Sequence, residues 1–136
     1  MPSENTPLPP LSLDCPKCKA KMHRRDYDIA SAYRCESCQG LWFPMLEFEH
    51  LREDADVVDV GDPDTGARYN SIDRIQCPAC KHPSPLVRMV DVQQPHIWFE
   101  SCKFCYGRFF DAGEFRDFAE VTVEDFFKRF KVDTRY

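Results

Sequence analysis

The residues of this chain whose type and spacing point most directly to chemistry are its eight cysteines. They occur in four C-x-x-C pairs, which in chain order are Cys15/Cys18, Cys35/Cys38, Cys77/Cys80 and Cys102/Cys105. Two such pairs in succession supply the four thiolates of a tetrahedral zinc site. The first two pairs therefore predict one zinc ion and the last two pairs a second, so we expect two zinc ions per chain.

Other uses of the same cysteines lead to different functions. A rubredoxin-like iron centre for electron transfer also needs two C-x-x-C loops, and spacing alone does not distinguish it from zinc. A thioredoxin-like redox pair is excluded because no βαβ pattern surrounds any pair. Four thiolates leave zinc no open position for a substrate, and the chain shows no nucleophile–histidine constellation or phosphate-binding glycine loop. We therefore expect no enzymatic activity and no small-molecule substrate.

The elements that must position these cysteines are small. The 136 residues include eleven prolines. A unit of roughly 40 residues around each cysteine set can fold because structural zinc contributes on the order of 10 kcal/mol or more to its folding. The chain is predicted to divide into a flexible N-terminal segment, a first zinc ribbon, an acidic connector, a second zinc ribbon and a C-terminal amphipathic helix. Their bounds are 1–12, 13–52, 53–71, 72–118 and 119–136.

Within each ribbon, the stretch between the two cysteine pairs is predicted to form a β-hairpin. In the second ribbon, residues 86–92 and 97–99 are rich in strand-forming residues and flank a turn-like Gln-Gln-Pro sequence. In the first ribbon, residues 21–24 and 29–34 fit a shorter hairpin. A short helix should follow each second pair, entered through Pro44 in one ribbon and through an Asp111 N-cap in the other. The expected fold class is a small zinc-stabilised α+β protein with two rubredoxin-like ribbons.

The two ribbons also form an internal repeat. Residues 35–51, CESCQGLWFPMLEFEHL, align with residues 102–118, CKFCYGRFFDAGEFRDF, at a constant offset of 67. The shared positions include both cysteines, Gly40/Gly107, Glu47/Glu114 and Phe48/Phe115. The first pairs, CPKC and CPAC, align at an offset of 62 because the second hairpin is five residues longer.

This pattern resembles the transcription factor IIB-like zinc-ribbon family of small, mostly prokaryotic proteins, here in two tandem copies. The resemblance rests on C-P-x-C, a hairpin, and then C-x-x-C-x-G followed by aromatic residues and Asp-x-Gly-Glu. The second copy keeps Asp111, Gly113 and Glu114, whereas the first has Pro44 at its helix entry. The resemblance implies zinc and a role near transcription, and it implies little about a partner.

The net charge and the lack of recognisable targeting signals restrict the expected partners and compartment of the protein. The formal net charge is −5, and each zinc with four thiolates adds two further negative charges. Binding of nucleic acid through net charge is therefore disfavoured. The sequence shows no signal peptide and no apolar run long enough to cross a membrane, so we expect a protein of the reducing cytoplasm, without a membrane partner.

Local charge supports an alternative hypothesis of nucleic-acid binding. Five basic residues gather on the first cysteine loop and the strand that leaves it, while the connector is acidic. A basic loop beside aromatic residues is suited to contact a nucleic-acid backbone. The candidate contact residues are Lys17, Lys19, Lys21, Arg24 and Arg25.

The C-terminal tail suggests a protein partner instead. From Thr122 onward the apolar residues recur at helical spacing, with charged residues between them, which predicts an amphipathic helix. Its apolar face packs on the ribbons or docks a partner, and the residues of that face are Val123, Phe126, Phe127 and Phe130. We favour a non-enzymatic adaptor that binds another protein, with a regulatory role near transcription.

Overall fold

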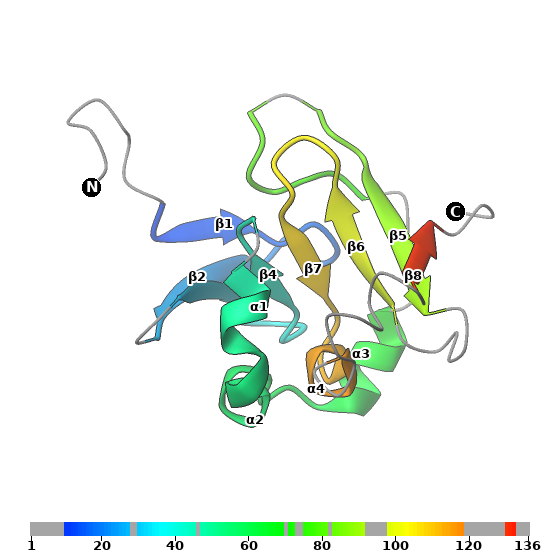
Figure 1. The fold of residues 1–136 in the computed structure, drawn as a ribbon. Helices are drawn as coiled ribbons and strands as arrows, with labels where there is room; N and C mark the ends of the chain where they lie inside the picture. Colours follow the sequence, from blue (N-terminus) through cyan, green and yellow to red (C-terminus); the bar gives the residue numbers. More distant parts are fainter. Residues whose placement is uncertain are drawn as a thin grey trace.

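The computed structural model describes residues 10–27, 30–45, 47–69, 71–72, 75–81, 83–91, 98–118 and 130–132. Its central feature is one antiparallel sheet of eight strands in the order β1-β2-β3-β4-β7-β6-β5-β8 (Figure 1). The first ribbon supplies the strands β1 (Ser12–Asp14), β2 (Lys21–Asp26), β3 (Ser31–Cys35) and β4 (Leu41–Phe43). The rest of the chain supplies β5 (Leu86–Asp91), β6 (Trp98–Cys102), β7 (Arg108–Phe110) and β8 (Phe130–Val132).

The predicted hairpins are confirmed. Strand β2 pairs with β3, and β5 pairs with β6, each in antiparallel register. In both ribbons the second strand of the hairpin ends at a cysteine, Cys35 in β3 and Cys102 in β6. Each hairpin therefore delivers a zinc ligand to one end of the sheet, and because β3 and β6 run in opposite directions, the two ligands lie at opposite ends.

The two ribbons meet at the middle of the sheet, where β4 pairs with β7. Trp42 is opposite Phe109, and these two residues align with each other in the sequence at the offset of 67. Leu41 is opposite Phe110, and Phe43 is opposite Arg108, so the pairing is symmetric about the Trp42–Phe109 pair. The two halves are thus joined as the subunits of a two-fold dimer would be.

This junction explains a glycine that both ribbons share. A Cβ atom on Gly107 would overlap the ring of Trp42, and one on Gly40 would overlap the ring of Phe109. Each glycine lets the central aromatic residue of the opposite ribbon lie directly against the backbone. Both rings are buried, so the neighbours have no room to move aside.

The sheet has a hydrophobic cluster on each face because side chains alternate along a strand. One cluster is built from phenylalanines of both ribbons and includes Phe43 and Phe110, whose rings meet edge to face with centroids 5.6 Å apart. The other contains Trp42 and Phe109 together with zinc-ligand cysteines. Most of the aromatic residues of the second ribbon are therefore core.

The described part of the chain contains five short helices. They are α1 (Glu47–Leu51), the 3-10 helix η1 (Arg52–Asp54), α2 (Ala55–Val58), α3 (Pro63–Tyr69) and α4 (Glu114–Phe118). Residues of three of them, α1, α2 and α4, belong to the phenylalanine cluster. Figure 1 shows α1, α2, α3 and α4 gathered at one end of the sheet. No helix among the described residues has the length and apolar composition needed to cross a membrane.

The acidic connector is more ordered than its sequence suggested. Its closely spaced valines Val57, Val58 and Val60 favour a short strand, and this prediction is wrong because Val57 and Val58 lie in helix α2. Val58 is buried in the phenylalanine cluster. Asp59 is also buried and accepts hydrogen bonds from the backbone N–H groups of Gly113 at 3.0 Å and Arg116 at 3.1 Å. The connector thus caps helix α4, which belongs to the second ribbon.

The C-terminal tail differs from the predicted amphipathic helix at its one described segment. Phe130 lies in strand β8, which pairs with the edge strand β5. An edge strand leaves a row of backbone groups without partners, and β8 satisfies those of β5. The other residues of the predicted partner face lie outside the described residues: Val123, Phe126 and Phe127.

Candidate metal centres

The four cysteine pairs come together as two separate groups of four, as their spacing predicted. The ligand atoms of each group lie within 4.8 Å of one another. The first group is Cys15, Cys18, Cys35 and Cys38, and the second is Cys77, Cys80, Cys102 and Cys105.

The spacing of the sulfur atoms fits a tetrahedral ion. Four sulfurs at about 2.3 Å from a central zinc are about 3.8 Å apart. The Sγ–Sγ distances are 3.7 Å for Cys15–Cys38 and 3.3 Å for Cys18–Cys35 in the first group. In the second group they are 3.6 Å for Cys77–Cys105 and 3.7 Å for Cys80–Cys102. Both donor sets therefore fit zinc and leave no ligand position for a substrate.

Backbone N–H groups of the cysteine loops point at the sulfur atoms. The N–H groups of Ser37 and Cys38 both lie 3.4 Å from Cys35 Sγ. Those of Phe104 and Cys105 lie 3.4 Å and 3.5 Å from Cys102 Sγ. Such donors stabilise a thiolate and hold it in place for a metal ion.

The thiols of the first group ionise unequally. Hydrogen bonds from Cys15 and Cys38, together with backbone donors, hold the pKa of Cys35 well below its usual range. The hydrogen bond that Cys15 gives to Cys35 is the main cause that raises the pKa of Cys15 to about 12. The shared thiol hydrogen bonds with Cys15 and Cys35 also raise the pKa of Cys38. Zinc must therefore displace protons from Cys15 and Cys38 when it binds at neutral pH.

The second group behaves in the same way. Burial acts to raise the pKa of Cys102, but the N–H groups of Cys105 and Phe104 outweigh it and lower the pKa. Burial raises the pKa of Cys105 to about 11 and also raises that of Cys77. Cys102 and Cys35 align with each other in the sequence, so in each site the thiol whose pKa is lowered occupies the matching place.

The residue after a cysteine loop adopts a left-handed conformation in three of the four loops. Lys19, Gln39 and Tyr106 have φ values of 67°, 64° and 63°. The left-handed region is costly for residues other than glycine, asparagine and aspartate. At the matching place of the remaining loop, the described residue Lys81 is not among the positive-φ residues.

Replacing Lys19 by glycine is therefore expected to stabilise the protein. The Lys19→Gly substitution should raise the free energy of unfolding of the zinc-loaded protein by about 1 kcal/mol, because glycine takes the left-handed conformation without strain. Thermal unfolding followed by circular dichroism measures this as a rise in Tm of about 4 °C. Lys81→Gly is the matched control, and an equal rise in that variant would contradict the explanation.

Lys17 is not part of a basic surface, which corrects the sequence prediction. Only 6% of it is exposed, and its ammonium group lies 2.7 Å from Asp111 Oδ2 and 3.2 Å from Glu100 Oε1. It also donates to the backbone carbonyl of Tyr69 at 3.1 Å and lies 5.6 Å from the centre of the Phe109 ring. The lysine of the first cysteine loop thus anchors the first ribbon in the second.

Burial alone acts to lower the pKa of Lys17, but attraction to Glu100 and Asp111 outweighs it and holds the pKa above its usual value. Burial raises the pKa of both carboxyl groups, and the charge of Lys17 opposes this. Arg88 lies 3.2 Å from Glu100 Oε1 and supplies a second positive charge. The predicted N-cap, Asp111, directs Oδ2 of its side chain at Lys17, and its backbone carbonyl accepts a hydrogen bond from Glu114 N–H.

Two other predicted contact residues are already paired. Lys21 Nζ lies 2.7 Å from Asp14 Oδ1, and Arg24 Nε lies 2.9 Å from Asp26 Oδ1. Both acidic partners are exposed, so these pairs lie at the surface. The remaining two predicted residues are also exposed: Lys19 and Arg25.

Comparison with protein families bears on the first site. Residues 14–54 match the family model of a transcription factor zinc-finger, the ribbon of the transcription factor IIB type. The match contains the whole first group of ligands. No family match covers the second group, and neither curated proteins nor solved structures give a significant match to the chain. The match and the two four-cysteine groups together support two zinc ions per chain.

Proposed function

We propose that this protein is a non-enzymatic adaptor, in which two zinc ribbons hold a rigid sheet that presents apolar side chains to another protein, in a process related to transcription. The observation that carries the proposal is the exposure of two aromatic residues beside a zinc ligand. Phe104 is 60% exposed and Tyr106 is 54% exposed, and they flank Cys105. Large exposed aromatic residues are costly in water and are enriched at protein interfaces.

Closed metal sites support a structural role for zinc. Each group supplies four sulfur ligands, and a catalytic zinc needs a position for water or substrate. The second ribbon, in this proposal, is a second copy of the first, since its hairpin and central strand have matching registers. A reducing compartment such as the cytoplasm suits the eight thiols.

Nucleic acid is the weaker alternative. Of the five basic residues that suggested it, Lys17 is buried in an ion pair, while Lys21 and Arg24 lie beside carboxylates. Each neutralised phosphate would release a counterion, so few free cations mean weak binding with a small salt dependence. Of these five residues, Lys19 and Arg25 are exposed and take part in none of the ion pairs found in the described part of the chain.

Affinity capture from the native cell, with identification of the bound proteins, tests the proposal. A protein should be retained by the zinc-loaded chain and should remain after nuclease treatment. Phe104→Asp should reduce its retention at least about tenfold, because an aspartate removes the apolar contact and leaves a charge there. Val57→Asp is the matched control, because Val57 is 64% exposed on helix α2. A ligand that disappears with nuclease, or capture that Phe104→Asp leaves unchanged, would refute the adaptor.

A further inference from the structure

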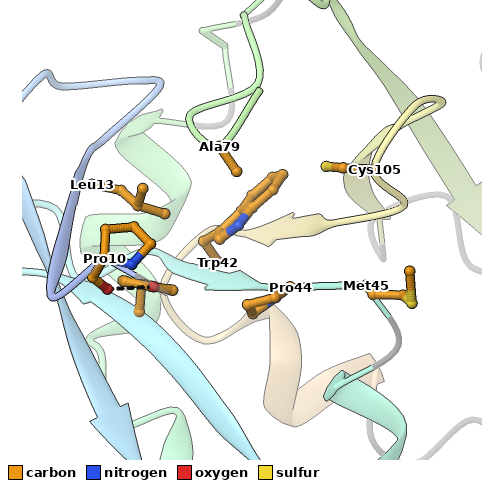
Figure 2. A pocket seen from close by; sticks show the side chains of 8 residues that line it. Pro10, Leu13, Trp42, Pro44, Met45, Ala79 and Cys105 are labelled. Carbon is orange, nitrogen blue, oxygen red and sulfur yellow. Dashed lines mark hydrogen bonds between the residues drawn. The ribbon is translucent and has the colours of Figure 1, made fainter. Parts of the chain in front are cut away.

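An apolar pocket lies where the second ribbon's first cysteine loop faces the first ribbon. Its volume is about 250 Å³. Residues from both ribbons line it, among them Tyr33, Trp42 and Pro44 from the first and Ala79 and Cys105 from the second (Figure 2). The pocket therefore lies across the junction of the two ribbons.

The internal repeat shows what this place holds in the other half of the molecule. The counterpart of Ala79 is Lys17, the third residue of the first cysteine loop, at the offset of 62 that relates the two loops. Lys17 inserts its side chain across the ribbon junction and is buried there. We call the space that the Lys17 side chain fills the Lys17 socket. The pocket is the corresponding space beside Ala79, and it is not filled from within because the alanine side chain ends at Cβ.

The walls of the two sockets correspond position by position. At the offset of 67, the residues that surround Lys17 are matched by residues that line the pocket. The ion-pair partners of Lys17 have apolar or aromatic counterparts, and the aromatic ring that Lys17 contacts has an aromatic counterpart. The matched positions are Glu100 with Tyr33, Asp111 with Pro44, and Phe109 with Trp42.

These differences between the residues lining the two sockets determine which kind of side chain the pocket can bind. Both carboxylates of the Lys17 socket are absent from the pocket, so a lysine or arginine would enter without a counter-charge. The hydroxyl of Tyr33 is already used, because it donates to the carbonyl of Pro10 at 2.6 Å, the bond drawn at the edge of the pocket in Figure 2. The indole N–H of Trp42 is buried and has no hydrogen-bond partner among the described residues, so the pocket favours an uncharged, largely aliphatic group.

Size and exposure indicate a side chain of a larger molecule. At about 250 Å³ the pocket falls below the usual range of about 300–1,000 Å³ for sites that enclose a whole small-molecule ligand. Its rim is apolar as well. Met45 is 58% exposed, and the exposed aromatic residues Phe104 and Tyr106 flank the lining residue Cys105. A polypeptide crossing this rim would place one side chain inside.

We propose that this pocket receives a single aliphatic side chain of a partner protein, of the size of leucine or methionine, in the manner in which Lys17 fills the corresponding socket. The inference rests on the proposed adaptor function and names the contact that recognises the partner. It assigns a role to Ala79, whose short side chain keeps the socket open.

A titration with model side chains tests the inference on the zinc-loaded full chain. The probes are N-acetyl-leucinamide and N-acetyl-methioninamide, with N-acetyl-lysinamide as the charged comparison, and ¹H–¹⁵N spectra record the binding. The two aliphatic probes should give saturable shifts at the amides of Tyr33, Met45 and Ala79, and the lysine probe should not. Absence of saturable shifts at these amides with the aliphatic probes would overturn the inference.

A substitution that fills the pocket distinguishes binding inside the pocket from nonspecific hydrophobic binding elsewhere on the protein. Ala79→Met should occupy the socket as Lys17 occupies its own and should weaken binding of the leucine probe at least about tenfold, the value of burying one such side chain. Ala67→Met adds the same side chain at an exposed position of helix α3 outside the pocket and should leave binding unchanged. Equal loss in both variants, or in neither, would overturn the inference.

Two other occupants would also overturn it. If Leu8→Asp raises the affinity for the leucine probe about tenfold, the chain's own N-terminal segment fills the pocket. If sedimentation shows a dimer that Ala79→Met converts to a monomer, the occupant is a second copy.

Two results distinguish a failure of the pocket from a failure of the proposed adaptor function. Capture of a protein that Phe104→Asp loses and Ala79→Met retains would uphold the adaptor and refute the pocket. Probe binding that Ala79→Met abolishes, in a protein that captures no partner from the cell, would refute the adaptor alone.

Discussion

Removing zinc is expected to unfold both ribbons together. Structural zinc in four-cysteine sites contributes on the order of 10 kcal/mol or more to folding, which equals or exceeds the whole stability of most small proteins. Each site holds the end of a hairpin in the shared sheet, and the hairpins meet through β4 and β7. Loss of the ions therefore removes the support of the entire sheet.

Metal analysis and circular dichroism measure this result. The purified protein should contain about two zinc ions per chain and show no visible absorption, whereas a rubredoxin-like ferric site would be coloured. Excess chelator should abolish the sheet signal in a single transition, and added zinc should restore it. A chelated protein that keeps its sheet and its thermal transition would contradict the expectation.

A single ligand substitution tests whether the two sites are coupled. Cys35→Ser should lose zinc from the first site and also weaken the second, because the first cysteine loop carries Lys17 into the second ribbon. The expected readout is a zinc content below one per chain after a mild chelator that leaves the unaltered protein at two. Ser37→Ala, an exposed change in the same loop, should keep both ions. A stable content of one zinc in Cys35→Ser would show independent sites.

Local sequence patterns were sufficient to predict the metal ligands and the hairpins. Ligand sets such as Cys15 with Cys18 are encoded within four residues, and two such loops need only one hairpin to meet. Strand-forming residues on either side of a turn then predicted β5 and β6, which the structure confirms. Each of these features depends on neighbours along the chain, so one sequence contains the necessary information.

The contacts between the ribbons could not be predicted from local sequence patterns. Lys17 and Asp111 are 94 residues apart, and no spacing rule links a lysine in a cysteine loop to a carboxylate after a strand. Asp59 and Gly113, the cap of helix α4, are 54 residues apart. One signal was available in the repeat itself. The loop position that carries Lys17 in one copy carries Ala79 in the other. The carboxylates that pair with Lys17 are likewise replaced by uncharged residues around Ala79.

Replacing Lys17 by alanine is expected to have the largest effect of any substitution outside the metal ligands. Breaking a buried ion pair by removing one partner costs about 3–5 kcal/mol, because the remaining charge stays buried without compensation. Here Glu100 and Asp111 both lose the ammonium group, and Arg88, 3.2 Å from Glu100 Oε1, remains as a positive charge near them. Chemical denaturation of the zinc-loaded Lys17→Ala protein measures the loss of unfolding free energy.

Two comparisons show whether the buried charge is the cause. Lys21→Ala removes a lysine with an equally short contact, 2.7 Å to Asp14, but the side chains of that pair are 58% and 70% exposed. Its loss should cost far less stability than the loss of Lys17, since water screens exposed pairs. The double variant Lys17→Met/Asp111→Asn should recover much of the stability lost in Lys17→Ala, because methionine keeps the packing, residue 111 no longer carries a charge, and Glu100 keeps its ion pair with Arg88. If the double variant is as unstable as Lys17→Ala, the charge left on the buried carboxylates is not the cause of the loss, and the explanation fails.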